Sequence, residues 1–339
     1  MSLTRRHLGW LFILTLLVLA GAIAAMCIGP VGMPVGDALG ALGRFVTGEA
    51  SSAQDALITH IRLPRILLSI LVGGSLAVAG AAMQAVFRNP LAEPGITGVS
   101  SGAAVVAVTL IVTGTVSATS WLLPVGAFCG SLVATAIVQS VGFGRAGTST
   151  ASLLLVGMAL NSFLGAITSA LIANAPNSDD ARSAMFWLNG DLTGRTLEDV
   201  GMVVVPLLMG VMGVLFFARE LNMLLLGDAT AQSAGVNVRL VSNLVLGCAA
   251  LTTAAGVAAT GVISFVGLVV PHLVRLIFGS NHRFLLPASF LLGALFLTVA
   301  DTAARMLFTP IVLQTGTITA LVGAPFLLFL VLRKRRRNT

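Results

Sequence analysis

The sequence contains few charged residues and many hydrophobic ones. Of its 339 residues, 9% are charged and 57% are hydrophobic, whereas about 25% of a typical soluble domain is charged. This small number of charged side chains cannot cover a surface exposed to water. Most of the chain must therefore face lipid or other buried helices. A disordered chain needs low hydrophobicity and high charge, and is excluded by the same figures. The composition predicts an all-α polytopic membrane protein.

Lysine and cysteine are scarce. The only lysine is Lys334, so the chain has no Gly-x-x-x-x-Gly-Lys-Ser/Thr loop, in which the lysine reaches the phosphates of a nucleotide. If ATP drives this protein, another subunit must hydrolyse it. Cys27, Cys129 and Cys248 lie far apart in apolar runs, without the spacing of a metal site or a disulfide framework. We expect no cofactor and no bound metal.

Ionisable residues are almost absent from the apolar segments. Asp301 is the one acid within them, and its simplest partner is Arg305, one helical turn later. Ion-coupled transporters usually bury acids or histidines as ion ligands or proton relays. An ion-coupled secondary transporter therefore remains only as an alternative of a different class. The apolar segments also lack an acid, base and nucleophile set, so we do not expect an enzyme.

Ten segments are long and apolar enough to cross a bilayer, which takes roughly 20 residues. They are 8–29, 65–86, 95–115, 121–141, 152–173, 199–218, 240–259, 262–278, 284–308 and 315–332. Only Thr260-Gly261 separates the seventh from the eighth, so these two are alternatively one broken segment.

The charges orient these spans. Both ends are basic, and with an even number of spans most basic residues lie on the side of the termini, whereas most acidic residues lie on the other side. This pattern places both termini in the cytoplasm. The basic residues flank apolar runs and form no basic face interleaved with aromatics, so nucleic acid is not an expected partner. We expect one domain, residues 1–339, with multiple passes through the inner (cytoplasmic) membrane.

Some segments between the spans are longer than a turn requires. On the outer side, a short surface helix is expected around Val35–Val46. Arg62 and Arg65 lie just before the second span, and Arg305 lies at the outer end of the ninth. These arginines either reach to lipid headgroups or grip carboxylates of a docking partner.

On the inner side, the long segment 219–239 is the main candidate for a contact with a partner. Asp228 is expected to N-cap a short helix that ends at Gly235. A helix of small residues suits a groove in a partner, although a plain connecting loop remains the alternative. Glu93, in the loop between the second and third spans, has no acid, base or metal partner in sequence and is expected to be structural.

Distinctive blocks of residues follow one another along nearly the whole chain. They are Arg62-Leu63-Pro64-Arg65, Arg88-Asn89-Pro90-Leu91-Ala92-Glu93-Pro94-Gly95, Gly98-Val99-Ser100-Ser101-Gly102-Ala103, Phe186-Trp187-Leu188-Asn189-Gly190, Leu226-Gly227-Asp228, Gly261-Val262-Ile263-Ser264-Phe265-Val266-Gly267-Leu268-Val269-Val270-Pro271-His272 and Ala300-Asp301. In these blocks the chain resembles the permease subunits of type II ABC importers for ferric siderophores, haem and cobalamin.

The resemblance implies a subunit of about ten helices that pairs with a second permease, either the same chain or a paralogue. It also implies a pair of cytoplasmic ATPase subunits and a periplasmic substrate-binding protein. It assigns docking of the binding protein to Arg62, Arg65 and Arg305. The implied residues for ATPase coupling are Gly227, Asp228, Ala231, Gly235 and Val236, and those for a cytoplasmic gate are Thr148, Ser149, Thr150 and Ser152.

One segment departs from the family pattern. The family often has Glu-Leu-Pro-Val-Gly before its last helix, whereas this chain has Val312-Leu313-Gln314-Thr315-Gly316. An acid and a proline are therefore missing on the outer side. The function we expect is the permease of a binding-protein-dependent importer for a ferric siderophore, with haem or cobalamin as alternative cargoes.

Overall fold

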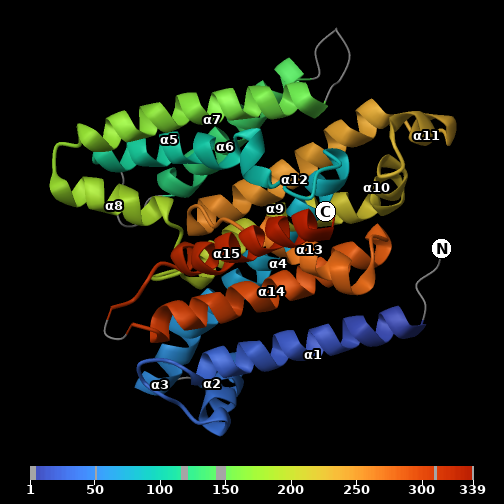
Figure 1. Cartoon of the computed structure of the whole chain (residues 1–339). Coiled ribbons are helices and arrows are strands. Elements are labelled where there is room, and N and C mark those ends of the chain that lie inside the picture. Colours follow the sequence, from blue (N-terminus) through green and yellow to red (C-terminus); the bar gives the residue numbers. More distant parts are fainter. Residues whose placement is uncertain (1–4, 50–51, 116–120, 143–149, 309–310, 338–339) are drawn as a thin grey trace.

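The protein is described by a computed structural model over residues 5–49, 52–115, 121–142, 150–308 and 311–337. These residues contain helices and no strands, as predicted. The long helices lie side by side in one bundle, with short helices at its two ends (Figure 1).

Ten helices correspond to the ten predicted spans. They are α1 (Arg5–Cys27), α4 (Leu63–Val86), α5 (Val99–Val112), α6 (Leu122–Gly142), α7 (Thr150–Ala173), α9 (Leu197–Phe216), α12 (Val238–Thr260), α13 (Val266–Phe278), α14 (His282–Met306) and α15 (Thr315–Arg337). Seven are long and apolar enough to cross a membrane, and α5, α13 and the apolar part of α15 are shorter. The prediction of ten spans is confirmed, with the seventh and eighth as separate helices.

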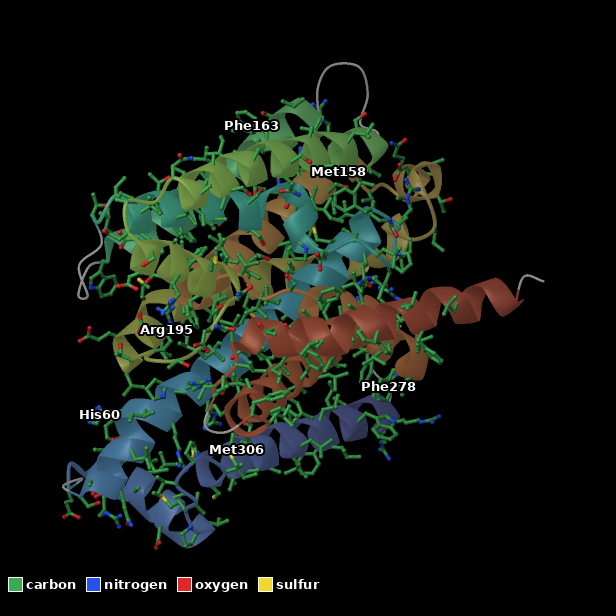
Figure 2. The ribbon with its side chains drawn as sticks, turned by 60° about the vertical axis from the view of Figure 1, so that its left-hand side comes forward. His60, Met158, Phe163, Arg195, Phe278 and Met306 are labelled. Carbon is green, nitrogen blue, oxygen red and sulfur yellow. The ribbon has the colours of Figure 1, made fainter. Side chains whose placement is uncertain are left out.

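The short helices mark the two ends of the bundle. At the end that we name the outer end lie α2 (Val35–Thr47), α3 (Ala53–Ala56), the π-helix η1 (Leu57–Arg62) and α8 (Ser178–Leu188). The opposite, inner end carries α10 (Ala218–Leu224), α11 (Asp228–Ser233) and the start of α1 (Figure 1). The expected surface helix near Val35 is therefore present as α2. The last turns of α15 also point to the inner end, so the start of α1 and the end of α15 lie on one side (Figure 2).

Helix α4 is the centre of the bundle, and it packs against α9, α12, α13 and α14. A Cβ atom added at Gly80 would lie 1.8 Å from the carbonyl oxygen of Gly267 on α13, and one at Gly73 would lie 2.4 Å from that of Gly293 on α14. Glycine at these positions lets the helix backbones touch, as is common between helices in lipid. By contrast, α7 is largely uncovered, and its Met158 and Phe163 project outward (Figure 2).

The break between α12 and α13 is held by distant segments. Gly261 and Phe265 both have φ of 70°, a conformation that is costly for a residue with a side chain. Burial raises the pKa of Glu93, and the nearby backbone of Phe265 opposes this shift. Asp191 N–H donates to Thr260 O at 2.8 Å. Both acids thus lie beside the break that separates the seventh and eighth spans.

Candidate functional site

The three predicted docking arginines line one cavity at the outer end. Arg62 closes η1, Arg65 lies in the first turn of α4, and Arg305 lies near the end of α14. The cavity has a volume of about 440 Å³, and we name it the outer cavity. Its other lining residues include Asp191, Thr193, Val312 and Gln314, together with the apolar side chains of Pro30, Val31, Leu57, Ile61 and Phe186.

Arg65 and Asp301 form a buried ion pair between α4 and α14. Arg65 Nε lies 2.8 Å from both carboxylate oxygens, and its terminal nitrogen lies 2.7 Å from Oδ1. Thr315 Oγ1 also donates to Asp301 at 2.9 Å. The expected pairing of Asp301 with Arg305 is present, but at 3.4 Å it is the longer one. The main partner of this intramembrane acid was therefore missed, because it lies 236 residues away in sequence.

Arg62 and Arg305 hold the outer end of α1. Arg62 donates to the carbonyl oxygens of Met26 and Val31, and Arg305 donates to that of Ala25 at 3.4 Å. Carbonyl groups at a helix C-terminus lack intrahelical partners and carry partial negative charge, so cations bind there favourably. The two guanidinium groups thus act as caps for α1.

The burial of these arginines corrects one of the two sequence interpretations. Arg62, Arg65 and Arg305 are only 3%, 7% and 8% exposed, so they do not extend to lipid headgroups. Arg62 and Arg65 were also expected just before the second span. They lie within it instead, because α3, η1 and α4 form one continuous helical stretch, Ala53–Val86. Internal carboxylate and carbonyl partners draw these side chains into the protein.

The outer cavity remains positively charged. Its three arginines face two carboxylates, Asp191 at 3.6 Å from Arg65 and Asp301. Val312 and Gln314, from the segment that departs from the family pattern, line the same cavity and bring no carboxylate to it.

Helix α11, the predicted coupling helix, lies at the inner end. Its start differs from the prediction, because Gly227, with φ of 104°, is the N-cap and Asp228 is the first helical residue. Its last helical residue is Ser233, two residues before the predicted end, and Ala234 is the C-cap. Gly235, with φ of 84°, then donates to Gln232 O, and Val236 donates to Ala231 O. These two bonds form a Schellman motif.

The coupling helix is anchored to the rest of the chain in two ways. Ala231 is fully buried and packs in a cluster with α4, α10 and α12, against which Val236 also packs. Asp228 accepts a hydrogen bond from Arg88 at 2.9 Å, and this ion pair explains why its carboxylate does not cap the helix. Arg88 follows α4 and has φ of 48°, in a position that glycine usually occupies. Sequence analysis did not single out Arg88, because nothing local signals its partner.

The predicted gate is only partly described. Thr148 and Ser149 lie outside the described residues. Thr150 is the first residue of α7, and Ser152 is exposed in its first turn. Within the described parts of the chain, no group of three or more His, Cys, Asp or Glu residues is arranged to hold a metal ion.

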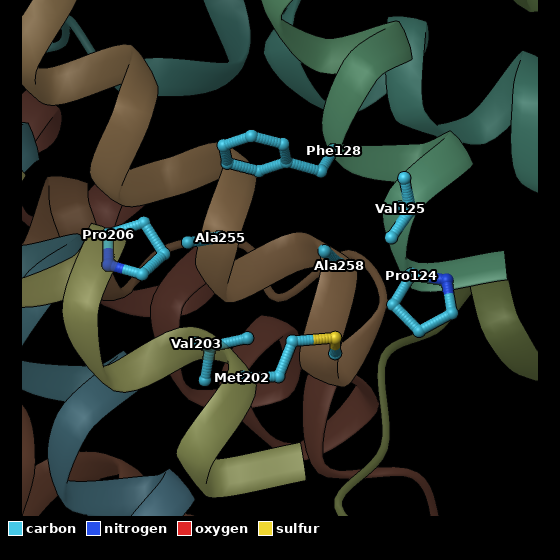
Figure 3. Close-up of a pocket in the computed structure, with 8 residues that line it drawn as sticks. All are labelled: Pro124, Val125, Phe128, Met202, Val203, Pro206, Ala255 and Ala258. Atoms are coloured by element: carbon cyan, nitrogen blue, oxygen red, sulfur yellow. The ribbon is translucent and has the colours of Figure 1, made fainter. Parts of the chain in front are cut away.

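A second pocket, of about 120 Å³, lies between α6, α9 and α12 (Figure 3). Its lining is entirely apolar, with Phe128 and Pro124 from α6, Met202 and Pro206 from α9, and Ala255 from α12 among its residues. This pocket offers no side chain that binds an ion or a polar cargo.

Comparisons with known proteins agree on the type of protein. The model of the FecCD transport family matches residues 15–333. The cobalamin import system permease protein BtuC of Halobacterium salinarum is 45% identical over 284 residues, 84% of this chain and 75% of that protein. The vitamin B12 import system permease protein BtuC of Salmonella typhi is 37% identical over 335 residues, 98% of this chain and 97% of that protein.

A solved structure is also similar over nearly the whole chain. It shows a protein assigned as a metal-chelate type ABC transporter in an inward-facing conformation. The TM-score is 0.84 at 31% identity, with 96% of this chain and 99% of the other covered.

The Asp301 carboxylate should be essential to the outer end of the fold. Asp301→Asn leaves the buried cations Arg65 and Arg305 without their shared anion, so we expect a loss of stability on the order of 3 kcal/mol. The measurement is the apparent melting temperature of the detergent-solubilised protein. Asp191→Asn is the matched control, because Asp191 faces the same arginine at 3.6 Å but is 26% exposed. Equal melting temperatures for the two variants would contradict this account.

Proposed function

Because this chain belongs to the FecCD transport family, we propose that it is the permease through which an ABC importer moves cobalamin. The membership itself makes the chain a multi-pass, non-catalytic membrane subunit of a type II ABC importer. Such a permease works with ATPase and binding-protein partners. The cargo is the proposed part.

The cobalamin proposal rests on the sequence similarity of this chain to relatives that are named as cobalamin permeases. Proteins named as cobalamin or vitamin B12 permeases are 45% and 37% identical to this chain. These relatives favour cobalamin, which the sequence left as an alternative cargo, over the ferric siderophore that we first expected. A ferric chelate remains the second candidate, because the similar solved structure belongs to a protein assigned as a metal-chelate type transporter.

On the outer side, we infer that the binding protein docks with acidic side chains at the outer cavity. The guanidinium group of Arg62 donates to two carbonyl oxygens, which accept hydrogen bonds but do not cancel a full charge. Arg65 and Arg305, in contrast, share the carboxylate of Asp301. An incoming carboxylate is therefore attracted chiefly to Arg62.

On the inner side, we infer that α11 contacts the ATPase and that Arg88 passes its movement to α4. The Arg88–Asp228 pair is the direct polar link between α11 and the end of α4. The two ends of α11 are shaped by Gly227 and Gly235. Its packing against the rest of the chain depends on Ala231 and Val236. The start of α7, residues 148–152, is retained as the proposed gate. A second permease, the same chain or a paralogue, completes the path.

The test of the proposed cargo uses the whole transporter in lipid vesicles. The chain is co-expressed with its ATPase and binding protein, and ATP hydrolysis and cargo uptake are measured with the binding protein loaded with cobalamin, a ferric siderophore or haem. We expect cobalamin alone to stimulate hydrolysis and to accumulate inside. Stimulation by the ferric siderophore alone would replace cobalamin as cargo, and failure of any ATPase to associate would overturn the importer itself.

Removing the charge of Arg62 should weaken docking. Arg62→Gln keeps donors for the carbonyls of α1 but loses the attraction for a carboxylate, so we expect affinity for the binding protein to fall about tenfold or more. Surface plasmon resonance with the permease complex in nanodiscs measures this affinity. The control is Arg182→Gln, which removes an exposed positive charge from α8 at the same end. An equal loss in both variants would show that overall charge, and not the outer cavity, governs docking.

Exchanging the charges of Arg88 and Asp228 should change the coupling of ATP hydrolysis to transport while leaving the stability of the fold nearly unchanged. The pair is exposed, at 37% and 47%, so it contributes at most about 1 kcal/mol to stability. We expect Arg88→Asp and Asp228→Arg each to lower cobalamin transported per ATP hydrolysed by up to about fivefold. The double variant should recover most of this ratio, because the ion pair is restored with reversed polarity. No recovery in a normally folded double variant would count against Arg88 as the link.

A further inference from the structure

A third pocket lies at the inner end, where α9, α10 and α14 meet. Its volume is about 410 Å³, and its lining residues are Leu215, Phe216, Ala218, Arg219 and Arg283. Two arginines that are 64 positions apart in the sequence thus share one pocket with apolar side chains. We name it the inner pocket. Neither the proposed cargo path nor α11 uses it.

The position of the inner pocket is that of the inner leaflet headgroups. Helix α9 ends at Phe216 and α14 begins at His282, and both of these helix ends lie at the inner end of the bundle (Figure 1). The headgroup layer of a bilayer begins where the apolar part of spanning helices ends. Arg219 and Arg283 therefore stand at the depth of lipid phosphates.

An exposed apolar stripe on α9 leads from the middle of the membrane to this pocket. Val205, Met209, Met212 and Phe216 are 60%, 62%, 62% and 80% exposed. Their spacing of three and four residues places them on one face of the helix. This face has no covering side chains in the described chain, and in a membrane acyl chains lie against it.

The electrostatics of the inner pocket favour an anion. No carboxylate is among its described lining residues, and Glu220, the acid next to Arg219 in the sequence, is not among them. The pocket also lies at the N-terminus of α14, which carries partial positive charge. Guanidinium groups bind phosphate oxygens in paired hydrogen bonds, and basic pockets between spanning helices on the cytoplasmic side suit anionic lipid headgroups.

We propose that the inner pocket binds an anionic phospholipid of the cytoplasmic leaflet, with its phosphate between Arg219 and Arg283 and an acyl chain along the α9 stripe. A zwitterionic lipid fits less well, because its own ammonium group competes with the arginines for the phosphate. The acyl chain distinguishes the lipid from free phosphate, which has no contact with the stripe.

Native mass spectrometry of the purified whole transporter tests this proposal. The protein is titrated with phosphatidylglycerol and with phosphatidylcholine. We expect phosphatidylglycerol to be retained roughly tenfold more strongly, and the double variant Arg219→Gln/Arg283→Gln to lose this preference. The control Arg6→Gln/Arg239→Gln removes two exposed arginines from the same side of the membrane, outside the pocket, and should keep it.

Other outcomes would overturn the lipid site. Equal loss of preference in both double variants would mean that the lipid responds to overall charge. Displacement of phosphatidylglycerol by a hundredfold excess of inorganic phosphate would indicate a phosphate site without a role for the acyl chain. Retention only after the ATPase has been stripped away would show that the partner protein, and not lipid, covers the pocket.

Discussion

A charge inside an apolar bundle needs a partner, and the Arg65–Asp301 pair meets this requirement at the outer end. Burial of an unpaired ion costs several kcal/mol, so the two helices that carry the pair must stay in register. These helices, α4 and α14, are also those whose backbones touch at Gly73 and Gly293. The ion pair and the glycine contact therefore support each other, and the outer cavity forms beside them.

The type of partner decides how much charge each arginine presents. A carboxylate cancels the charge of Arg65, whereas the carbonyl groups at the end of α1 satisfy the hydrogen bonds of Arg62 and leave its charge in place. Because Arg62 is only 3% exposed, this charge is screened less than it would be at an open surface. A buried arginine cluster can thus still attract an acidic partner.

The sequence predicts the ten spans well because each is a local property, an apolar stretch of bilayer length. The helices lie within a few residues of the predicted segments, and the left-handed backbone of Gly235, just past the end of α11, follows from the conformational freedom of glycine. The pairs that build the candidate sites are not local. Arg65 finds Asp301 across 236 positions, and Arg88 finds Asp228 across 140. Neither pairing leaves a pattern in nearby residues, and Arg88 even occupies a left-handed position that its residue type disfavours.

The two candidate contact sites are joined by one helix. Arg65 lies in the first turn of α4 and Arg88 follows its last turn, and α4 itself, with 24 residues, is about 36 Å long at 1.5 Å per residue. Its middle is locked against α13 and α14 by backbone contacts at Gly80 and Gly73, which leave no space for it to bend independently. In the coupling that we propose, a displacement of α11 that pulls on Arg88 moves α4 together with its neighbours, and with them the arginines of the outer cavity. By reciprocity, a partner that shifts these arginines would bias the position of α11. The buried helix α4 is thus the element on which the proposed coupling between the two faces of the membrane depends.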